Sequence, residues 1–240
     1  MLTVVRDDLA PSGVLRAAIN LGNPVLAQGS PDDPRGVTVD LAYELAERLG
    51  LAARLECFDA AGKSYEAMAS GDADICFLAV DPDREEQVAF TTPYVVIEGV
   101  YAVARESSIL TAADVDRPGV RVGVKRGSAY DLHLSRTLRH ATVVRGGDGV
   151  DVFANEQLEV AAGIREPMVE YLLANPHLRL VDGRFMLIRQ AIGTTRARRP
   201  ETVAYLQEFV EDVKASGFVA QSLKRSGQSP SLVAAPEDAV

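Results

Sequence analysis

The stretch AVDPDREEQVAFTTPY, residues 79–94, decides the fold. The apolar run 74–80 leads into it and is typical of a buried strand. Asp81 then suits a helix N-cap and Pro82 the first helical position, which places Arg84 in the first turn of a short helix. Ligands of open α/β sheets bind at this carboxyl edge, where a guanidinium offers a rigid fork of donors to a carboxylate or phosphate. A surface ion pair with a nearby acid is the alternative role for Arg84.

Composition and charge narrow the classes of partner. The chain has 240 residues, 47% of them hydrophobic and 25% charged, which suits one or two globular domains. Its 25 basic and 34 acidic residues give a net charge of −9. This balance disfavours nucleic acid and anionic membranes as partners but leaves a small anion open. The chain has no run of 18 apolar residues, so the sequence predicts no membrane span.

The cysteines and histidines give no sign of a metal or cofactor. Cys57 and Cys76 lie in predicted strands and are expected to be buried, inert thiols, with a disulfide as the weaker alternative. There is no CxxC pair, and the three histidines lack ligand spacing. We therefore expect no cofactor and no metal.

The segment MLTVVRDDLAPSG does not resemble a secretory leader, so a removed leader and a protein that is never exported both stay open.

Strands alternate with helices along the chain, which predicts α/β architecture with parallel sheets and right-handed crossovers. A first set has strands at 14–20, 51–58 and 74–80 and helices at 37–49 and 63–70. A strand at 98–105 leads to a second set, with strands at 120–124, 141–145, 158–163 and 185–193 and helices from 128 and at 150–154, 166–174, 200–216 and 218–225. Residues 228–240 are expected to form a loose tail, and Arg196, Arg198 and Arg199 a surface cluster. Two such α/β sets favour a small-molecule cleft between them.

Four blocks in this order and spacing carry a family resemblance: GVTVDLAYELAERLGL (36–51), EAMASGDADICFLAVDPDREEQVAFTTPY (66–94), VGVKRGSAY (122–130) and ETVAYLQEFVEDVKASGFV (201–219). Over roughly residues 14–227 the chain resembles type 2 periplasmic binding proteins. More narrowly, it resembles the family 3 extracellular solute-binding proteins of polar amino-acid ABC transporters.

The resemblance implies a two-lobe α/β fold in which each lobe is a mostly parallel sheet flanked by helices. Lobe 1 would hold residues 1–103 plus 188–240, and lobe 2 residues 104–187, joined by two hinge strands. It also implies a non-enzymatic, monomeric protein that closes on a small anionic or zwitterionic ligand and serves an ABC-transporter permease. A periplasmic or extracytoplasmic location follows by resemblance, with a cytoplasmic one open because the chain shows no leader.

Three residues match the family's carboxylate-binding positions. Arg84 matches the arginine that takes the ligand carboxylate. Ser128 and Ala129 match the Gly-Thr-Thr turn, whose backbone N–H groups receive the same carboxylate at a helix N-terminus. Ser128 also suits a plain N-cap, and both roles can hold together.

Other positions depart from the family pattern. Asn23 stands where the family usually has an aromatic residue that sandwiches the ligand, and Asn20 where an aspartate is common. Ala79 replaces a hydroxyl-bearing residue. Gln190 follows the second crossover, where relatives sometimes place a ligand or hinge contact.

Arg165 occupies the position of the aspartate that pairs with the ligand α-ammonium group. A guanidinium there would repel an ammonium group and offer it no acceptor. An organic acid or dicarboxylate therefore suits Arg84 and Arg165 better than a standard amino acid. A one-residue shift in alignment would make Glu166 the acceptor instead, and Arg165 also suits a surface position at the start of a helix.

Two other function classes are alternatives to ligand transport. Some relatives of this family are dehydratases of cyclic carboxylic acids, and Glu98, an acid in an apolar strand, is a candidate acid/base. Its simpler role is an ion pair with a local arginine. A sensing domain of a regulator is disfavoured, because the chain has no room for a helix-turn-helix and its acidity opposes DNA.

Overall fold

The computed structural model describes residues 2–236 and divides into two compact units. Unit 1 comprises Met1–Val96 and Arg189–Val240, and unit 2 comprises Ile97–Ile188. Two long strands, β6 (Val88–Ala104) and β11 (Met186–Thr195), run from one unit into the other.

The sheet of unit 1 has the order β4-β1-β5-β11. Strands β1 (Val14–Asn20), β4 (Ala52–Phe58) and β5 (Ile75–Ala79) are parallel, and β11 is antiparallel to β5. The carboxyl ends of β1 and β5 therefore lie at one edge of the sheet, together with the part of β11 that pairs with the end of β5. That edge is where ligands of open α/β sheets bind.

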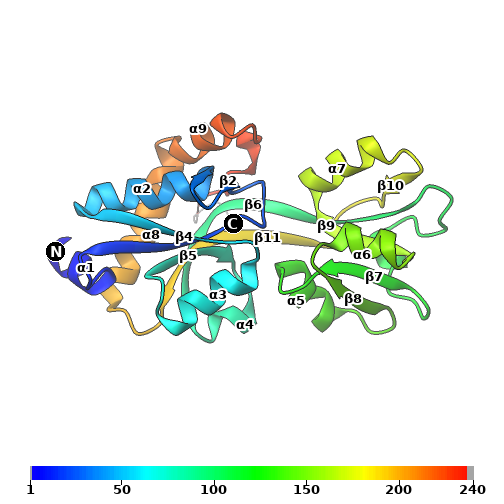
Figure 1. Ribbon diagram of the computed structural model, residues 1–240, viewed down its shortest axis with the longest axis horizontal. Helices are drawn as coiled ribbons and strands as arrows, with labels where there is room; N and C mark the ends of the chain where they lie inside the picture. The colour runs from blue at the N-terminus through cyan, green and yellow to red at the C-terminus, as the bar shows by residue number, and fades with distance from the viewer. Residues whose placement is uncertain (1, 237–240) are drawn as a thin grey trace. The chain divides into compact units, whose positions relative to one another are not determined.

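Helices cover both faces of this sheet. Helices α2 (Val37–Leu49) and α9 (Phe218–Arg225) lie on one face, and α3 (Ala61–Ser70) lies on the other (Figure 1). Helix α2 has the predicted bounds, because its apolar residues recur on one face and Gly50 ends it with a φ of 64°. The short α4 (Pro82–Glu85) follows β5, and α8 (Pro200–Ala215) precedes α9.

The N-terminal region holds elements that the sequence did not predict. Residues Leu2–Leu9 form α1, which packs on α8 and buries Val5 and Leu9. The β-branched residues of this helix hid it, because its stability comes from packing rather than propensity. A small hairpin, β2 (Gln28–Ser30) with β3 (Asp33–Arg35), was also missed.

The sheet of unit 2 has the order β6-β9-β7-β8, with β10 (Leu178–Leu180) also on β6. Strands β7 (Arg121–Lys125), β8 (Thr142–Gly146) and β9 (Val160–Ile164) are parallel, and β6 is antiparallel to β9. The helices are α5 (Ala129–Thr137), α6 (Gly149–Asn155) and α7 (Arg165–Ala174), with a short 3-10 helix at Ala112–Asp114. Within residues 2–236, no helix combines the length and apolar character needed to cross a bilayer.

The expectation of a loose C-terminal tail is wrong for residues 228–236. This segment forms a 3-10 helix at Pro230–Leu232 and returns to β6, where Val233 makes a β-bridge with Val95. The N–H of Ala234 donates to the carbonyl of Tyr94 at 3.1 Å, and Lys214 Nζ donates to the carbonyl of Ala235 at 3.2 Å. The polar composition suggested a free tail, but a few backbone hydrogen bonds and one buried alanine hold it. Residues 237–240 lie outside the described part of the chain.

A chain that ends at Gln228 is expected to lose about 1–3 kcal/mol of stability in unit 1. The deletion removes two hydrogen bonds and the apolar cover of Ala234, each a contribution on the order of 1 kcal/mol. Hydrogen exchange should rise at Tyr94–Val96 and stay unchanged in β7 of unit 2, which serves as the internal control. Unchanged exchange at Tyr94 and Val95 would contradict this role for the tail.

The surface cluster expected before α8 is correct for Arg196 and Arg199, which are exposed, but not for Arg198. The Arg198 side chain is only 14% exposed and lies 3.3 Å from the carboxylate of Asp74. Its Nη1 also donates to the carbonyl of Asp8 in α1. Arg198 therefore ties α1 to the sheet of unit 1, a contact between distant segments that local sequence does not reveal.

Candidate functional site

In unit 1, four of the predicted residues lie at the carboxyl edge of the sheet. Asn20 ends β1 and Ala79 ends β5. Gln190 of β11 pairs with Ala79 across the antiparallel ladder and is 5% exposed. Arg84 follows in the first turn of α4, which Asp81 caps by accepting the N–H of Asp83, as predicted.

Arg84 is a buried cation. Only 3% of the residue is exposed, and its Nη1 donates to the carbonyl of Ala79 at 3.1 Å. Burial lowers the pKa of Arg84, while the nearby carboxylate of Asp81 opposes that shift. Arginine stays protonated even so, which means that unit 1 holds a positive charge at the end of β5. A buried charge is expensive and is therefore more often kept for function than for packing.

The two asparagines shape the loop after β1. Asn20 Oδ1 accepts the N–H of Gly22 at 3.0 Å, and Asn23 Oδ1 accepts the N–H of Val25 at 3.2 Å. Asn23 is 5% exposed, which is buried for an amide. Their side-chain oxygen atoms therefore organise the loop. This structural role stands beside the ligand contact that the sequence predicts for both asparagines.

In unit 2, the N-terminus of α5 lies at the carboxyl end of β7. Ser128 is its N-cap, with Oγ accepting the N–H of Asp131 at 3.0 Å, so the N-cap role is observed. The N–H of Ser128 itself donates to the carbonyl of Lys125 at 3.2 Å. Helix geometry leaves the amide of Ala129 as an orphan donor, with the helix dipole favouring an anion there.

Asp131 supports this turn from within the helix. It is 3% exposed, and its Oδ2 accepts the N–H of Gly127 at 2.9 Å. Arg145 of β8 donates to Oδ1 at 2.8 Å, which neutralises the buried carboxylate. The shape of the turn is thus fixed by residues of unit 2 alone.

Arg165 and Glu98, predicted separately, meet in unit 2. Arg165 begins α7 and its Nε lies 2.5 Å from Glu98 Oε2, while its Nη2 donates to the carbonyl of Gly183 at 3.1 Å. Arg184 Nη1 lies 3.0 Å from Glu98 Oε1. Glu98 therefore has the simpler role foreseen for it, an ion pair with local arginines. Sequence reasoning missed Arg184, because a contact between residues 86 positions apart leaves no local signal.

Glu166 has a different environment from Glu98. Its Oε2 is buried and has no hydrogen-bond partner within residues 2–236. Burial raises the pKa of the Glu166 carboxyl group, Glu98 adds to the shift, and Arg165 opposes it. This carboxyl group therefore holds its proton more readily than an exposed glutamate.

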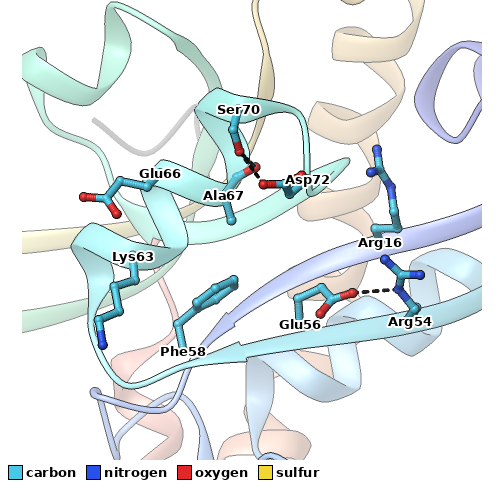
Figure 2. Close-up of a pocket in the computed structure, with 9 residues that line it drawn as sticks. All are labelled: Arg16, Arg54, Glu56, Phe58, Lys63, Glu66, Ala67, Ser70 and Asp72. Atoms are coloured by element: carbon cyan, nitrogen blue, oxygen red, sulfur yellow. Dashed lines mark hydrogen bonds and ion pairs between the residues drawn. The ribbon is translucent and has the colours of Figure 1, made fainter.

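A cavity of about 720 Å³ lies elsewhere in unit 1, between α3 and the β4 edge of the sheet (Figure 2). None of the predicted site residues lines it. Several of its polar groups are already engaged: Arg54 pairs with Glu56 at 2.6 Å, and Ser70 donates to Asp72 at 2.7 Å. We therefore do not assign it a ligand.

The two cysteines are free thiols in β4 and β5. Cys76 is fully buried, and burial raises its pKa to about 12. Cys57 is half-buried, and burial raises its pKa as well. Thiols this reluctant to ionise are poor nucleophiles, as expected from the sequence.

Comparison with known proteins identifies the fold. A mutant of ArgBP from T. maritima superposes with a TM-score of 0.75 over 93% of this chain and 99% of that one, at 19% identity. The ancestral amino-acid-binding protein AncCDT-1, a precursor of cyclohexadienyl dehydratase, superposes with a TM-score of 0.72 over 91% and 97%, at 18% identity. The predicted type 2 periplasmic-binding-protein fold is confirmed.

The sequence comparison extends from fold to family. The ABC transporter arginine-binding protein 1 of Escherichia coli (strain K12) is 25% identical over 211 residues, which are 81% of this chain and 82% of that protein. Residues 15–228 match the family described as bacterial extracellular solute-binding proteins, family 3. The resemblance noted in the sequence is thereby confirmed, and the chain belongs to the bacterial extracellular solute-binding proteins of family 3.

Proposed function

We propose that this chain is the solute-binding component of an ABC-type uptake system and binds a small carboxylate-bearing metabolite. The observation that carries the proposal is Arg84, a buried cation in the first turn after β5. In unit 2, the start of α5 at Ser128 adds the amide of Ala129 as a candidate donor for an acidic group of the ligand. The chain would act outside the cytoplasm as a monomer and pass its ligand to a membrane permease.

The ligand is an organic acid or dicarboxylate in preference to an α-amino acid. Related proteins are named for arginine, but Arg165 stands where the family's ammonium-binding aspartate is expected. Glu98 is a poor acceptor for an ammonium group, because the guanidinium groups of Arg165 and Arg184 lie against it and would repel a third cation. Glu166 is the remaining acid here, and a one-residue shift in alignment would make it the ammonium acceptor. Asn20, Asn23, Ala79 and Gln190 would line the unit 1 side of the site.

A thermal-shift screen tests the proposal. At a ligand concentration of 100 Kd, binding stabilises the folded state by about 2.7 kcal/mol. For a chain of this size that corresponds to a rise in Tm of roughly 5–10 °C. Succinate, malate and 2-oxoglutarate should give the shift. Arginine, lysine and glutamine give a smaller one or none; the reverse order would reject the organic-acid assignment.

A second candidate function is a dehydratase of a cyclic carboxylic acid. The observation that favours it is Glu166, a half-buried carboxyl group whose raised pKa suits a general acid. The likeness to AncCDT-1 supports the scaffold only. Turnover of a prephenate-like acid by the purified protein, lost on Glu166→Gln, would favour this function, and absence of turnover would leave the binding protein.

A further inference from the structure

Three charged side chains form a cluster at one edge of the unit 2 sheet. The antiparallel pairing of β6 with β9 sets Gly99 opposite Ile164, which brings Glu98 beside Arg165 at the start of α7. On the other side, the N–H of Phe185 donates to the carbonyl of Gly99 at 2.9 Å and brings Arg184 to Glu98. The edge is also the carboxyl end of β7, where α5 begins.

A backbone hydrogen bond from Phe185 to Gly99 and side-chain packing hold these segments together without the ion pairs. A Cβ on Gly99 would lie 2.7 Å from Met186 Cγ and 2.8 Å from the Phe185 ring, so the chain at 185–186 packs directly on β6. Phe185 in turn stacks on Tyr101 with ring centroids 4.3 Å apart. Removing the Arg184 side chain should therefore leave the fold of unit 2 intact.

The cluster has more hydrogen-bond donors than it uses. A guanidinium carries five N–H donors. Arg165 uses two and Arg184 uses one in contacts with described residues, so seven of the ten remain. Both oxygen atoms of Glu98 accept an arginine, and the three side chains together carry one net positive charge.

These side chains are reachable from solvent. The exposed side-chain fractions are 34% for Arg165, 29% for Glu98 and 51% for Arg184. Exposed ion pairs add little to stability, about 0–1 kcal/mol, so stability alone gives little reason for two arginines on one carboxylate. One carboxylate that fixes two guanidinium groups instead pre-organises them for a second anion.

We propose that Arg165 and Arg184, held in place by Glu98, form a subsite for a second acidic group of the ligand, and that Arg184 determines specificity for dicarboxylates. This inference rests on the proposed function, since it assumes a carboxylate ligand. It adds Arg184 to the site and makes the ligand class a diacid rather than any organic acid.

The test compares dicarboxylates with matched monocarboxylates. Calorimetry would measure the Kd of succinate and butyrate, and of 2-oxoglutarate and 2-oxobutyrate, for the unmodified chain and for Arg184→Gln. The variant should bind the dicarboxylates about tenfold more weakly, which corresponds to the loss of about 1.4 kcal/mol, and should bind the monocarboxylates unchanged. Arg117→Gln is the matched control, because Arg117 lies in the same unit, is 50% exposed and pairs with Asp114.

The outcomes separate the inference from the proposed function. If the unmodified chain binds no carboxylate, the proposed function fails and the subsite with it. If it binds carboxylates but Arg184→Gln leaves the dicarboxylate Kd unchanged, or weakens both classes equally, only the subsite is wrong. A stronger affinity of the unmodified chain for monocarboxylates would overturn the subsite as well.

Discussion

Replacing Arg84 with methionine is expected to abolish ligand binding. A guanidinium binds a carboxylate through two charge-assisted hydrogen bonds, each contributing about 1.5–3 kcal/mol. Losing both weakens binding roughly 10²–10⁴-fold. The measurement is calorimetry with the carboxylate that gives the largest thermal shift.

The position of Arg84 is the reason for so large an effect. The residue is 3% exposed and lies in a helix of only four residues directly after β5. Burial has already removed water from the guanidinium, so part of the desolvation cost of binding a carboxylate is met in the folded protein. A cation fixed in position and shielded from water favours an anion.

The choice of methionine and of a control separates binding from folding. Methionine keeps much of the apolar stem of Arg84 and removes the charge. Arg54→Met removes an exposed arginine of the same unit, one that pairs with Glu56, and should leave Kd unchanged. If Arg84→Met retains a native unfolding curve and wild-type affinity, the carboxylate contact lies elsewhere.

Local patterns in the sequence were enough for most of the α/β framework. Strand β1 and helices α2 and α9 have the predicted bounds, because each has a regular apolar spacing and ends at a turn. Strand β6 is much longer than predicted: it begins at Val88, and Pro93 within it suggested a break. Pro93 is tolerated because proline fits a strand where its missing N–H is not needed by a neighbour.

The candidate site was predicted only where its chemistry is local. Asp81, Pro82 and Arg84 lie within four consecutive residues. Ser128 caps α5 by accepting the N–H of Asp131, only three residues later. The link from Glu98 to Arg184 joins distant segments, so only the folded sheet brings them together. The same reason hid the burial of Arg198.

Replacing Asp74 with alanine is expected to give the largest loss of stability in unit 1, about 3–5 kcal/mol. Asp74 is fully buried and accepts hydrogen bonds from the backbone N–H of Arg16 at 2.9 Å and from its Nη2 at 2.7 Å. Its carboxylate also lies 3.3 Å from Arg198 Nη2. Breaking a buried pair by removing one partner typically costs this much, because it leaves uncompensated buried charge.

Removing the Asp74 carboxylate takes away an acceptor that Arg16 and Arg198 share. The hydrogen bonds that Arg16 donates to Asp74 raise the pKa of Arg16, so this contact favours the charged guanidinium. Arg198 Nε is already buried without a partner within residues 2–236, so it has little further capacity for rearrangement. Without Asp74, the N-terminus of β1, the start of β5 and the turn before α8 lose their common anchor.

Urea unfolding measures the loss, with hydrogen exchange in β1 and β5 to confirm that unit 1 is affected, since two units need not unfold together. Glu56→Ala is the control, because Glu56 pairs with the exposed Arg54 and should cost less than about 1 kcal/mol. Asp74→Asn keeps the side-chain shape but not the charge, and should lie between the control and the alanine variant. If Asp74→Ala falls within 1 kcal/mol of the control, roughly the limit for an exposed pair, then packing of α1 and α8, rather than the charges, stabilises this end of the sheet.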